Sequence, residues 1–485
     1  MATKTLAPPA GPRLRPNCLS FSELLAQAVA LISPTMTAAL IVPVMFANAG
    51  NGSWLAYAFG TVMLLFVALN LNQFARRSTS SGSMYVYTSR GLGPTAGGIA
   101  GWCLIWAYLF ISIAGLAGFT NFANVILGRF HAHAPPLLLF AVCAGIAWYV
   151  AYKDIQVSTL IMLFLEGVSV TLILVLTGIV LFHHGIPVDR AQLTLKGTTF
   201  SSMGFGVVVA IFSLVGFECA TAFGDEAKNP LKTIPRAVIW SLLATGLFFV
   251  VVTYMEVYGT RGYKTTLDQL TAPLNDLADI ARVGWLAIPL SLGAAISFFS
   301  LSLSCLNAGA RILYPMGKHG VFHSAVGQSH AKHETPHIAV SVMAALMLVV
   351  AAGLILWHPV VVDVFGFAGT FGAFGFLFAY FLITIATPAY LKKIGELRPG
   401  HVALAAVTLL LLLVPAVGSV YTNPPLTAPV KYFPYIFLGY FALGVAWFLS
   451  LRMRSPGSIA DIERDIEATH GRFALSRERE EAQVA

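Results

Sequence analysis

The sequence predicts an all-α integral membrane protein with twelve transmembrane helices. Of its 485 residues, 57% are hydrophobic and 10% are charged, whereas a soluble domain carries about 25% charged residues. The mean hydropathy is +0.78. Between Phe21 and Leu451 the sequence contains no polar linker of the kind that joins soluble domains. A surface with so few charges suits lipid rather than water.

A window of about 19 residues identifies twelve apolar segments along the chain. They are residues 21–48, 54–75, 95–127, 136–152, 155–182, 204–224, 235–259, 283–310, 337–358, 360–390, 401–421 and 432–451. Each is long enough to cross a hydrocarbon core about 30 Å thick. Because the number of segments is even, both ends of the chain are expected on the same side of the membrane.

The distribution of Lys and Arg selects that side. If the chain begins in the cytoplasm, the inner segments hold 22 of the 29 Lys and Arg residues, as the positive-inside rule requires. We therefore expect a multi-pass protein of the cytoplasmic (plasma) membrane with both termini cytoplasmic. The same bias explains the net charge of +8 without a nucleic-acid partner.

Three regions follow from the span positions. They are a cytoplasmic N-terminal tail (1–20), a membrane domain (21–452) and a charged cytoplasmic C-terminal tail (453–485). The first region lacks the apolar core and cleavage site of a removable signal peptide. The C-terminal tail is expected to be a solvated helix, with regulation as the alternative role. The five cysteines are too scattered for a zinc or redox site, so no metal or cofactor is expected.

Two of the spans contain residues that interrupt a helix. The first carries Ser33-Pro34-Thr35-Met36-Thr37, in which Pro34 removes an amide donor and clashes with the preceding turn. The sixth carries Gly216 and Glu218 in mid-span. Broken helices survive in hydrocarbon only where protein buries them or where they line a cavity. A simple proline kink is the alternative for the first span.

The two interrupted spans are five spans apart, as in transporters built from an inverted repeat, which hold substrate near the bilayer midplane. The start of a half-helix offers free amides and a partial positive charge to an anion. The carbonyls at the end of the other half-helix can accept hydrogen bonds from an ammonium. Such a site suits a zwitterion.

Three motifs resemble those of the amino acid–polyamine–organocation (APC) permeases. The segment Gly216–Ala237, GFECATAFGDEAKNPLKTIPRA, is similar to the signature of the sixth span of that family. The segment Ser81–Trp102 is similar to the stretch between spans two and three, and Ala310–Tyr314 to the loop after span eight. The resemblance covers residues 21 to about 452.

The resemblance implies a fold and a mode of action. The fold is a five-plus-five inverted repeat, leucine-transporter-like, with repeats at about 21–183 and about 204–390 and two peripheral helices at about 401–452. The implied action is alternating access on an amino acid or a related amine.

The resemblance also implies substrate contacts on the first span. The Gly-Ser-Gly break of the family falls on Met36-Thr37-Ala38, so both glycines are absent here, and the Ser33-Pro34 pair is another source of unwinding. Thr37 and the Ala38 amide are expected to bind the substrate carboxylate, and the Pro34 carbonyl is expected to face the amino group.

On the sixth span, the resemblance assigns the carbonyls of Phe212 and Val215 to the substrate ammonium and the Phe212 ring to an aromatic lid. Ser213 is expected to line the pocket. The alternatives are core packing for Phe212 and satisfaction of freed backbone groups for Ser213.

Acidic residues inside the spans need a reason, because each costs roughly 2.5–3.5 kcal/mol on insertion scales. By resemblance, Glu218 couples the site to the cytoplasmic gate as a proton-sensitive group; the alternative is a protonated side chain that donates to backbone across the break. Glu166 lies in mid-fifth span, where several proton-coupled relatives carry a lysine, and is a second proton-coupling candidate or a simple bond to a neighbouring helix. Interfacial solvation is expected to explain Glu256 and Asp363.

The cytoplasmic charges form a candidate inner gate. Its expected members are Asp225, Glu226, Lys228, Arg236 and Arg311. Exposed ion pairs are individually weak, up to about 1 kcal/mol, which suits pairs that break in each cycle. The alternative is that the basic members only signal topology.

The function predicted from these features is secondary active transport of amino acids, proton-coupled or by exchange, and sodium-independent. The alternative within the same fold is an amine or polyamine permease, which requires several acids facing the pocket. An ion channel requires a continuous polar stripe or a ring of charges, and a membrane enzyme requires a catalytic motif that the spans lack. The expected partners are a small-molecule substrate and the lipid bilayer. The sequence does not predict an oligomeric state.

Overall fold

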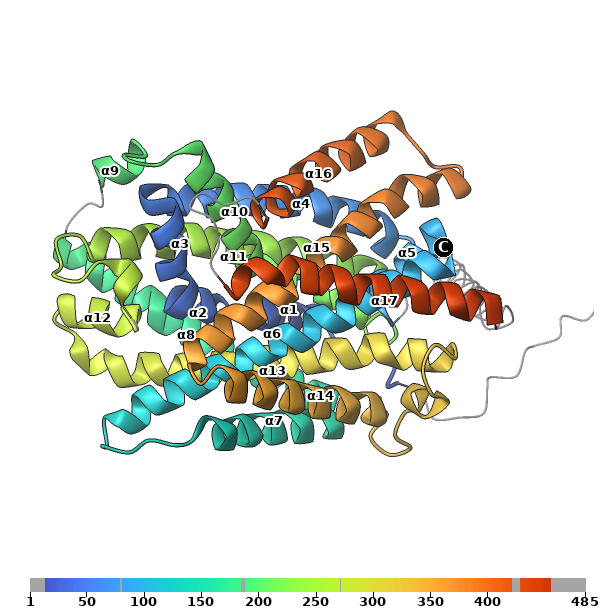
Figure 1. The fold of residues 1–485 in the computed structure, drawn as a ribbon, viewed down its shortest axis with the longest axis horizontal. Helices are drawn as coiled ribbons and strands as arrows, with labels where there is room; N and C mark the ends of the chain where they lie inside the picture. Colours follow the sequence, from blue (N-terminus) through green and yellow to red (C-terminus); the bar gives the residue numbers. More distant parts are fainter. Residues whose placement is uncertain (1–13, 79–80, 185–187, 271, 421–427, 455–485) are drawn as a thin grey trace, which may run out of the picture.

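The computed structural model describes residues 14–78, 81–184, 188–270, 272–420 and 428–454. Within these residues the chain is almost entirely helical, and its only β pairings are isolated bridges. The helices run along the long axis of the molecule (Figure 1). Most of the two predicted tails, residues 1–13 and 455–485, lies outside the described residues.

The helical elements, in chain order, are α1 (Phe21–Ile32), α2 (Pro34–Met36), the π-helix η1 (Thr37–Ile41), α3 (Val42–Ala49), η2 (Gly50–Gly52), α4 (Ser53–Ala75), α5 (Ser83–Leu92), α6 (Pro94–Gly128), α7 (Pro136–Lys153), α8 (Ile155–His184), α9 (Arg190–Leu193), α10 (Phe200–Leu214), η3 (Phe217–Ala222), α11 (Pro230–Gly259), η4 (Leu267–Gln269), α12 (Pro273–Ile280), η5 (Gly284–Leu286), α13 (Ala287–Lys318), η6 (Ser324–Gly327), α14 (His337–Trp357), α15 (Val361–Lys393), α16 (Pro399–Gly418), η7 (Val430–Tyr432) and α17 (Phe433–Arg454).

Eleven helical runs in the described chain are long and apolar enough to span a membrane. The first run, Phe21–Ala75, has 55 residues and as one straight helix would extend about 80 Å, far more than a bilayer core of about 30 Å. It is interrupted at η2, where Gly50 has a φ of 53°. This run therefore accounts for two of the twelve predicted passes, and the all-α multi-pass fold is confirmed.

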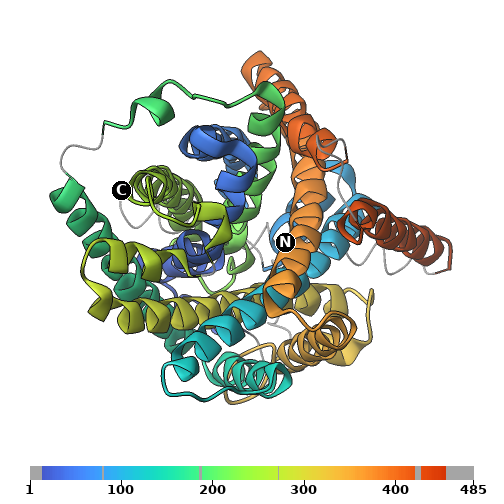
Figure 2. The same cartoon turned by 60° about the vertical axis from the view of Figure 1, so that its left-hand side comes forward.

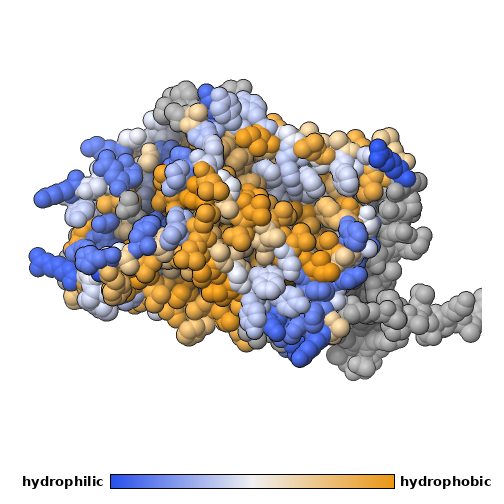
Figure 3. All heavy atoms as spheres, turned by 60° about the horizontal axis from the view of Figure 1, so that its bottom comes forward, coloured by the Kyte–Doolittle hydropathy of each residue, from blue (hydrophilic) through white to orange (hydrophobic). Residues whose placement is uncertain are grey.

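The outer surface has the polarity expected of a membrane protein. On the face seen in Figure 3, apolar residues form a band between two more polar ends. Large apolar side chains are exposed on the peripheral helices, among them Phe164, Val349, Leu410 and Leu443. The end of the molecule at which α17 terminates is called the inner end, and the end with α9 and α12 is called the outer end (Figure 1).

The helix packing agrees with two structurally related halves. We match α1, α4, α6, α7 and α8 in order with α10, α11, α13, α14 and α15. Where two helices pack together, their counterparts also pack together, as a two-fold relation between the halves requires. Thus α1 packs on α11 while α10 packs on α4, and α6 packs on α15 while α13 packs on α8. Helices α16 and α17 lie at the periphery (Figure 2). The packing is what the predicted inverted repeat requires.

The packing of α6 against α13 depends on small residues. Helices α6 and α13 cross closely at Gly115, where an added Cβ would meet the Ser302 side chain and the Phe298 carbonyl. One turn along, a Cβ at Gly118 would collide with the Phe298 ring. Without a hydrophobic drive between helices in lipid, such close backbone approach supplies much of the packing energy.

An ionic cluster ties three elements together at the outer end. The carboxylate of Asp189, which is 6% exposed, accepts hydrogen bonds from Arg261 Nε at 2.5 Å and from Gln192 Nε2 at 3.0 Å. Arg261 Nη2 also donates to Asn51 Oδ1 at 2.6 Å. Burial alone opposes the charged form, but the bonds from Gln192 and Arg261 prevail and lower the pKa of Asp189 below its ordinary value.

We expect Arg261→Gln to destabilise the protein at neutral pH by about 1–3 kcal/mol, because Asp189 loses charged donors. A carboxyl with a lowered pKa stabilises the fold above its ordinary pKa and loses that contribution as the pH falls through the lowered value. The deficit of the variant should therefore shrink between pH 7 and pH 3. Thermal unfolding in detergent measures it, with the exposed Lys264→Gln as control. A deficit that is constant across this range would contradict the assignment.

Candidate functional site

The first interruption lies at Ser33 and Pro34. Helix α1 ends at Ile32, because Ser33 adopts the left-handed conformation (φ 51°, ψ 75°) and Pro34 has no amide proton. Met36, at the end of α2, has helical dihedrals, and so does Thr37, with which the π-helix η1 begins. The structure thus places the unwinding at the Ser33-Pro34 pair and not on Met36-Thr37-Ala38, because the proline forces the break three residues earlier.

The second interruption lies at Val215 and Gly216. Helix α10 ends at Leu214, Val215 is extended (φ −60°, ψ 147°) and Gly216 has a φ of 107°. A side chain is strained at that φ, and a Cβ at Gly216 would also collide with Leu31 of α1. Leu31 lies just before the first interruption. The two breaks, far apart in sequence, therefore meet in the core.

The predicted substrate residues are gathered at these breaks. Pro34, Met36, Thr37, Ala38, Ser213 and Val215 are all buried, and Phe212 is half-buried. The hydroxyl of Thr37 has no hydrogen-bond partner in the described chain. The hydroxyl of Ser213 lies 3.0 Å from the Tyr57 hydroxyl and donates to the Val209 carbonyl at 3.3 Å. Ser213 is thus held by a tyrosine that the sequence did not single out.

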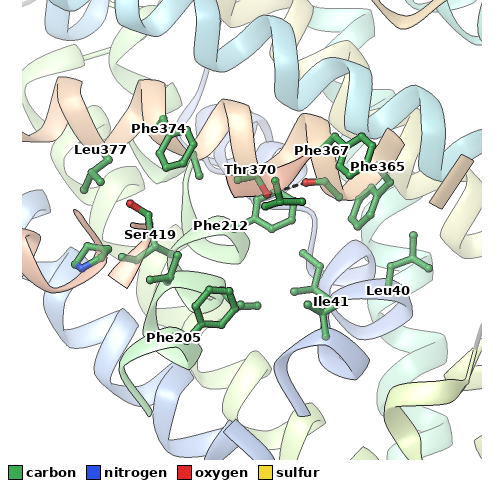
Figure 4. Close-up of a pocket in the computed structure, with 18 of the residues that line it drawn as sticks. Leu40, Ile41, Phe205, Phe212, Phe365, Phe367, Thr370, Phe374, Leu377 and Ser419 are labelled. Atoms are coloured by element: carbon green, nitrogen blue, oxygen red, sulfur yellow. Dashed lines mark hydrogen bonds between the residues drawn. The ribbon is translucent and has the colours of Figure 1, made fainter. Parts of the chain in front are cut away.

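A cavity of about 340 Å³ lies beside the break in the sixth span (Figure 4). Phe212 lines it, three residues before Val215, together with apolar side chains such as Ile41, Phe205 and Leu377. The Phe212 ring packs against Gly369 of α15, and its centroid lies 5.9 Å from that of Phe365. Phe212 therefore stands between an apolar cavity and the interrupted backbone.

Glu218 bridges the second break to two other helices. Its carboxyl accepts from the Tyr380 hydroxyl at 2.8 Å, the Tyr108 hydroxyl at 3.2 Å and the Gly216 amide at 3.1 Å. The side chain is fully buried. The backbone donates to Glu218, the reverse of the alternative in which a protonated Glu218 donates to backbone.

Glu166 bridges the first break to neighbouring helices, as Glu218 bridges the second. Its Oε1 accepts from the Thr35 hydroxyl at 3.2 Å and from the Thr35 amide at 3.4 Å, while Oε2 accepts from the Ser297 hydroxyl at 2.5 Å. Ser297 also lies 3.0 Å from the Ser33 hydroxyl. Helices α8 and α13 are thereby joined to the unwound part of the first span.

Glu226 and Arg311 form a buried ion pair at the inner end. Arg311 Nε and Nη2 lie 2.5 and 2.7 Å from the two carboxylate oxygens, and the side chains are 1% and 0% exposed. The guanidinium lies 4.5 Å from the centroid of the Phe223 ring. The segment before α1 covers the pair, since the Leu19 amide donates to the Glu226 carbonyl at 2.9 Å.

The other predicted gate residues are placed differently. Lys228 and Arg236 are exposed, Asp225 is partly exposed, and none of the three forms an ion pair in the described chain. Of the five charges, the structure joins Glu226 and Arg311 alone. This pair is dehydrated and bidentate, unlike the weak exposed pairs expected from the sequence.

The two acids assigned to interfacial solvation behave differently from one another. Asp363 is 47% exposed and lies 2.6 Å from His358. Glu256 is only 1% exposed, so the interfacial explanation was wrong for this residue. The error arose because position near the end of a span was taken to mean exposure, whereas neighbouring helices cover that face of α11.

Sequence reasoning also missed the partners of the acids. Tyr108, Tyr380 and Ser297 come from spans three, ten and eight, and their hydroxyls stood out only as polar groups in apolar segments. Without the packing, none could be oriented. In the described part of the chain, no group of three or more His, Cys, Asp or Glu side chains is arranged to hold a metal ion.

Several relatives share parts of this sequence. The branched-chain amino acid permease BcaP of Bacillus subtilis is 24% identical over 316 residues, which cover 60% of this chain and 65% of the relative. The low-affinity putrescine importer PlaP of Escherichia coli K12 is 28% identical over 315 residues, with the same coverage. The BcaP of Lactococcus lactis is 26% identical over 402 residues, covering 79% of this chain and 83% of the relative. The chain thus spans just under two thirds of the length of the first two.

A family model described as amino acid permease matches residues 23–446. That interval contains both helix breaks, the buried acids Glu166, Glu218 and Glu256, and the inner ion pair. The match confirms the resemblance to the APC permeases and shows that the chain belongs to the amino acid permease family.

Proposed function

We propose that this protein is a secondary active transporter that moves amino acids across the cytoplasmic membrane by alternating access, with both termini in the cytoplasm. The observation that carries the proposal is the meeting of two interrupted helices in the core, at Leu31 and Gly216. Transport is proton-coupled or by exchange, and independent of sodium. The names of the relatives, two amino acid permeases and a putrescine importer, support this substrate range, with amines as the alternative.

The proposed site binds both charged groups of an amino acid. The Thr37 hydroxyl, buried and without a protein partner in the described chain, donates to the substrate carboxylate. The Gly216 amide donates to Glu218 instead of completing the helical bond to the Phe212 carbonyl. That carbonyl, with the carbonyl of Val215, is available to accept from the ammonium. The Phe212 ring covers the ligand on the side of the cavity.

The inner end is closed in this conformation by the Glu226–Arg311 pair. Opening it requires the pair to separate and both ions to regain water, while the Phe212 ring, which packs against α15, stays closed on the other side. Glu166 and Glu218 each join one break to neighbouring helices, so a change in the protonation of either acid alters the hydrogen bonds that hold a break. This is how proton binding is coupled to the movement of the half-helices.

We expect Thr37→Ala to weaken amino acid binding roughly 10- to 100-fold, the worth of one hydrogen bond to a charged group. Protein stability should be unchanged, because the hydroxyl has no partner in the described chain. Uptake into proteoliposomes and thermal shift with added amino acids measure both effects. The control is Thr245→Ala, which removes a buried hydroxyl that bonds only to its own helix. Unchanged uptake of every accepted amino acid would argue against the site.

We expect Glu218→Gln and Glu166→Gln to change the pH dependence of uptake. An amide keeps the shape of the side chain but neither gains nor loses a proton near neutral pH. Initial rates of uptake between pH 5 and pH 8 measure the effect. Asp268→Asn is the matched control, since Asp268 is an exposed acid that lines neither described cavity. If both variants retained the parent profile, proton coupling through these residues would be abandoned.

We expect Glu226→Gln to destabilise the closed inner end by about 3–5 kcal/mol, because it leaves the Arg311 guanidinium buried without a counter-charge. Thermal unfolding and thiol labelling of Cys18, whose amide donates to the Glu226 carbonyl at 2.8 Å, report the change. Labelling should rise as the end opens. Lys228→Gln, which removes an exposed charge that forms no ion pair in the described chain, should alter neither readout; equal effects of the two variants would rule out the gate.

A further inference from the structure

Glu256 is a buried acid that the proposed transport mechanism does not use. It lies on α11 within one turn of the outer end of that helix, and it is 1% exposed. Neither of its carboxyl oxygens has a hydrogen-bond partner in the described chain. Glu166 and Glu218, in contrast, each accept three hydrogen bonds. A buried carboxyl left in this state is costly, and an acid inside a membrane commonly marks the path of a substrate or ion.

The surroundings of Glu256 supply further oxygen atoms. Thr253, one turn earlier on the same side of α11, is fully buried, and its hydroxyl has no hydrogen-bond partner in the described residues. Tyr57 lies on α4, which packs against α11, and its hydroxyl lies 3.0 Å from the Ser213 hydroxyl. Tyr57 therefore joins the second helix break to a helix that packs on the one carrying Glu256.

The first helix break lies on the same side. Helix α11 packs against α2 and η1, and η1 begins at Thr37, whose hydroxyl also lacks a partner within the described residues. The elements that hold Thr37, Ser213 and Glu256 are thus direct neighbours. Because η1 and α10 both pack on α11, the side chain of a ligand held between the breaks lies next to the helix that carries Glu256.

The hydrogen-bonding groups of Glu256 and Thr253 indicate which kind of ligand fits them. Two carboxylate oxygens and the Thr253 hydroxyl present at least three acceptors, and an ammonium has three donors and no acceptor. A proton on Glu256 removes the charge, but no group in the described chain then donates to its second oxygen. Charge-assisted bonds between an ammonium and a carboxylate are roughly twice as strong as neutral ones. The group is therefore best matched by a cationic amine.

We propose that Glu256 binds the side-chain ammonium of a basic amino acid whose α-amino and carboxylate groups are held at the two breaks. This inference rests on the proposed function and narrows its substrate class. Thr253 contributes a hydroxyl to the same ammonium, and Tyr57 links this subsite to Ser213. Diamines share the chemistry of the second ammonium but lack the carboxylate that Thr37 binds.

The test compares lysine with leucine in proteoliposomes of the full-length protein. The parent should take up lysine with the higher affinity. Glu256→Gln should raise the KM for lysine at least tenfold and leave that for leucine within about twofold, while Glu256→Asp should recover part of the lysine affinity. Asp268→Asn, an exposed acid that lines neither cavity described for the chain, is the matched control and should change neither substrate. Leucine uptake by Glu256→Gln shows that the variant is folded.

Three results obtained with the Glu256→Gln variant would overturn the inference. The first is an equal change, or no change, for the two amino acids. The second is that uptake of both amino acids by the parent requires sodium or potassium and that Glu256→Gln removes this requirement, which would assign an inorganic cation to Glu256. The third is a variant that shifts only the pH profile of uptake. A parent that transports leucine but not lysine contradicts this inference alone, whereas a parent that transports no amino acid contradicts the proposed function.

Discussion

The structure depends on one constraint, that a polar backbone group in hydrocarbon needs a partner inside the protein. The helical spans meet it mainly with hydrogen bonds inside each helix. The two interrupted spans cannot, because Pro34 lacks an amide proton and Gly216 turns the chain out of the helix. Glu166 and Glu218 supply acceptors for the Thr35 and Gly216 amides that the breaks release. The acids that stabilise the breaks are thus also the groups that a proton can alter.

The architecture and the proposed mechanism share these contacts. Glu218 is bonded to hydroxyls on α6 and α15, and Glu166 to a hydroxyl on α13, so each break is tied to the long helices that pack closely through glycine. A movement of either half-helix must exchange those hydrogen bonds for others. The same holds at the inner end, where the Glu226–Arg311 pair is almost fully buried; in the proposed mechanism, opening replaces it by hydration of both ions. Polar contacts of this kind have discrete arrangements, which suits alternation between two states.

The sequence predicted the break in the sixth span correctly, because Gly216 stands two residues before Glu218, the one charged residue of that apolar segment. It left two positions open for the first break, since the family resemblance pointed to Met36-Thr37-Ala38 while Pro34 pointed three residues earlier. The proline decided the matter, because no neighbouring contact can restore its missing donor. Glu256 was misjudged, since distance from the end of a span does not reveal which side of the helix is covered. Nothing in the sequence linked the acids to Tyr108, Tyr380 or Ser297.

By itself, the sequence determined the environment of the protein, the number of its passes and the family to which it belongs. Hydropathy and charge act locally along the chain and need no knowledge of packing. The tertiary structure alone decided which polar groups are satisfied: within the described residues it left Thr37, Thr253 and Glu256 without partners, and it joined Arg311 to Glu226 and not to Asp225. The physical reason is that hydrogen bonds and ion pairs between spans depend on the rotation of each helix about its axis, which only the packing of the whole bundle sets.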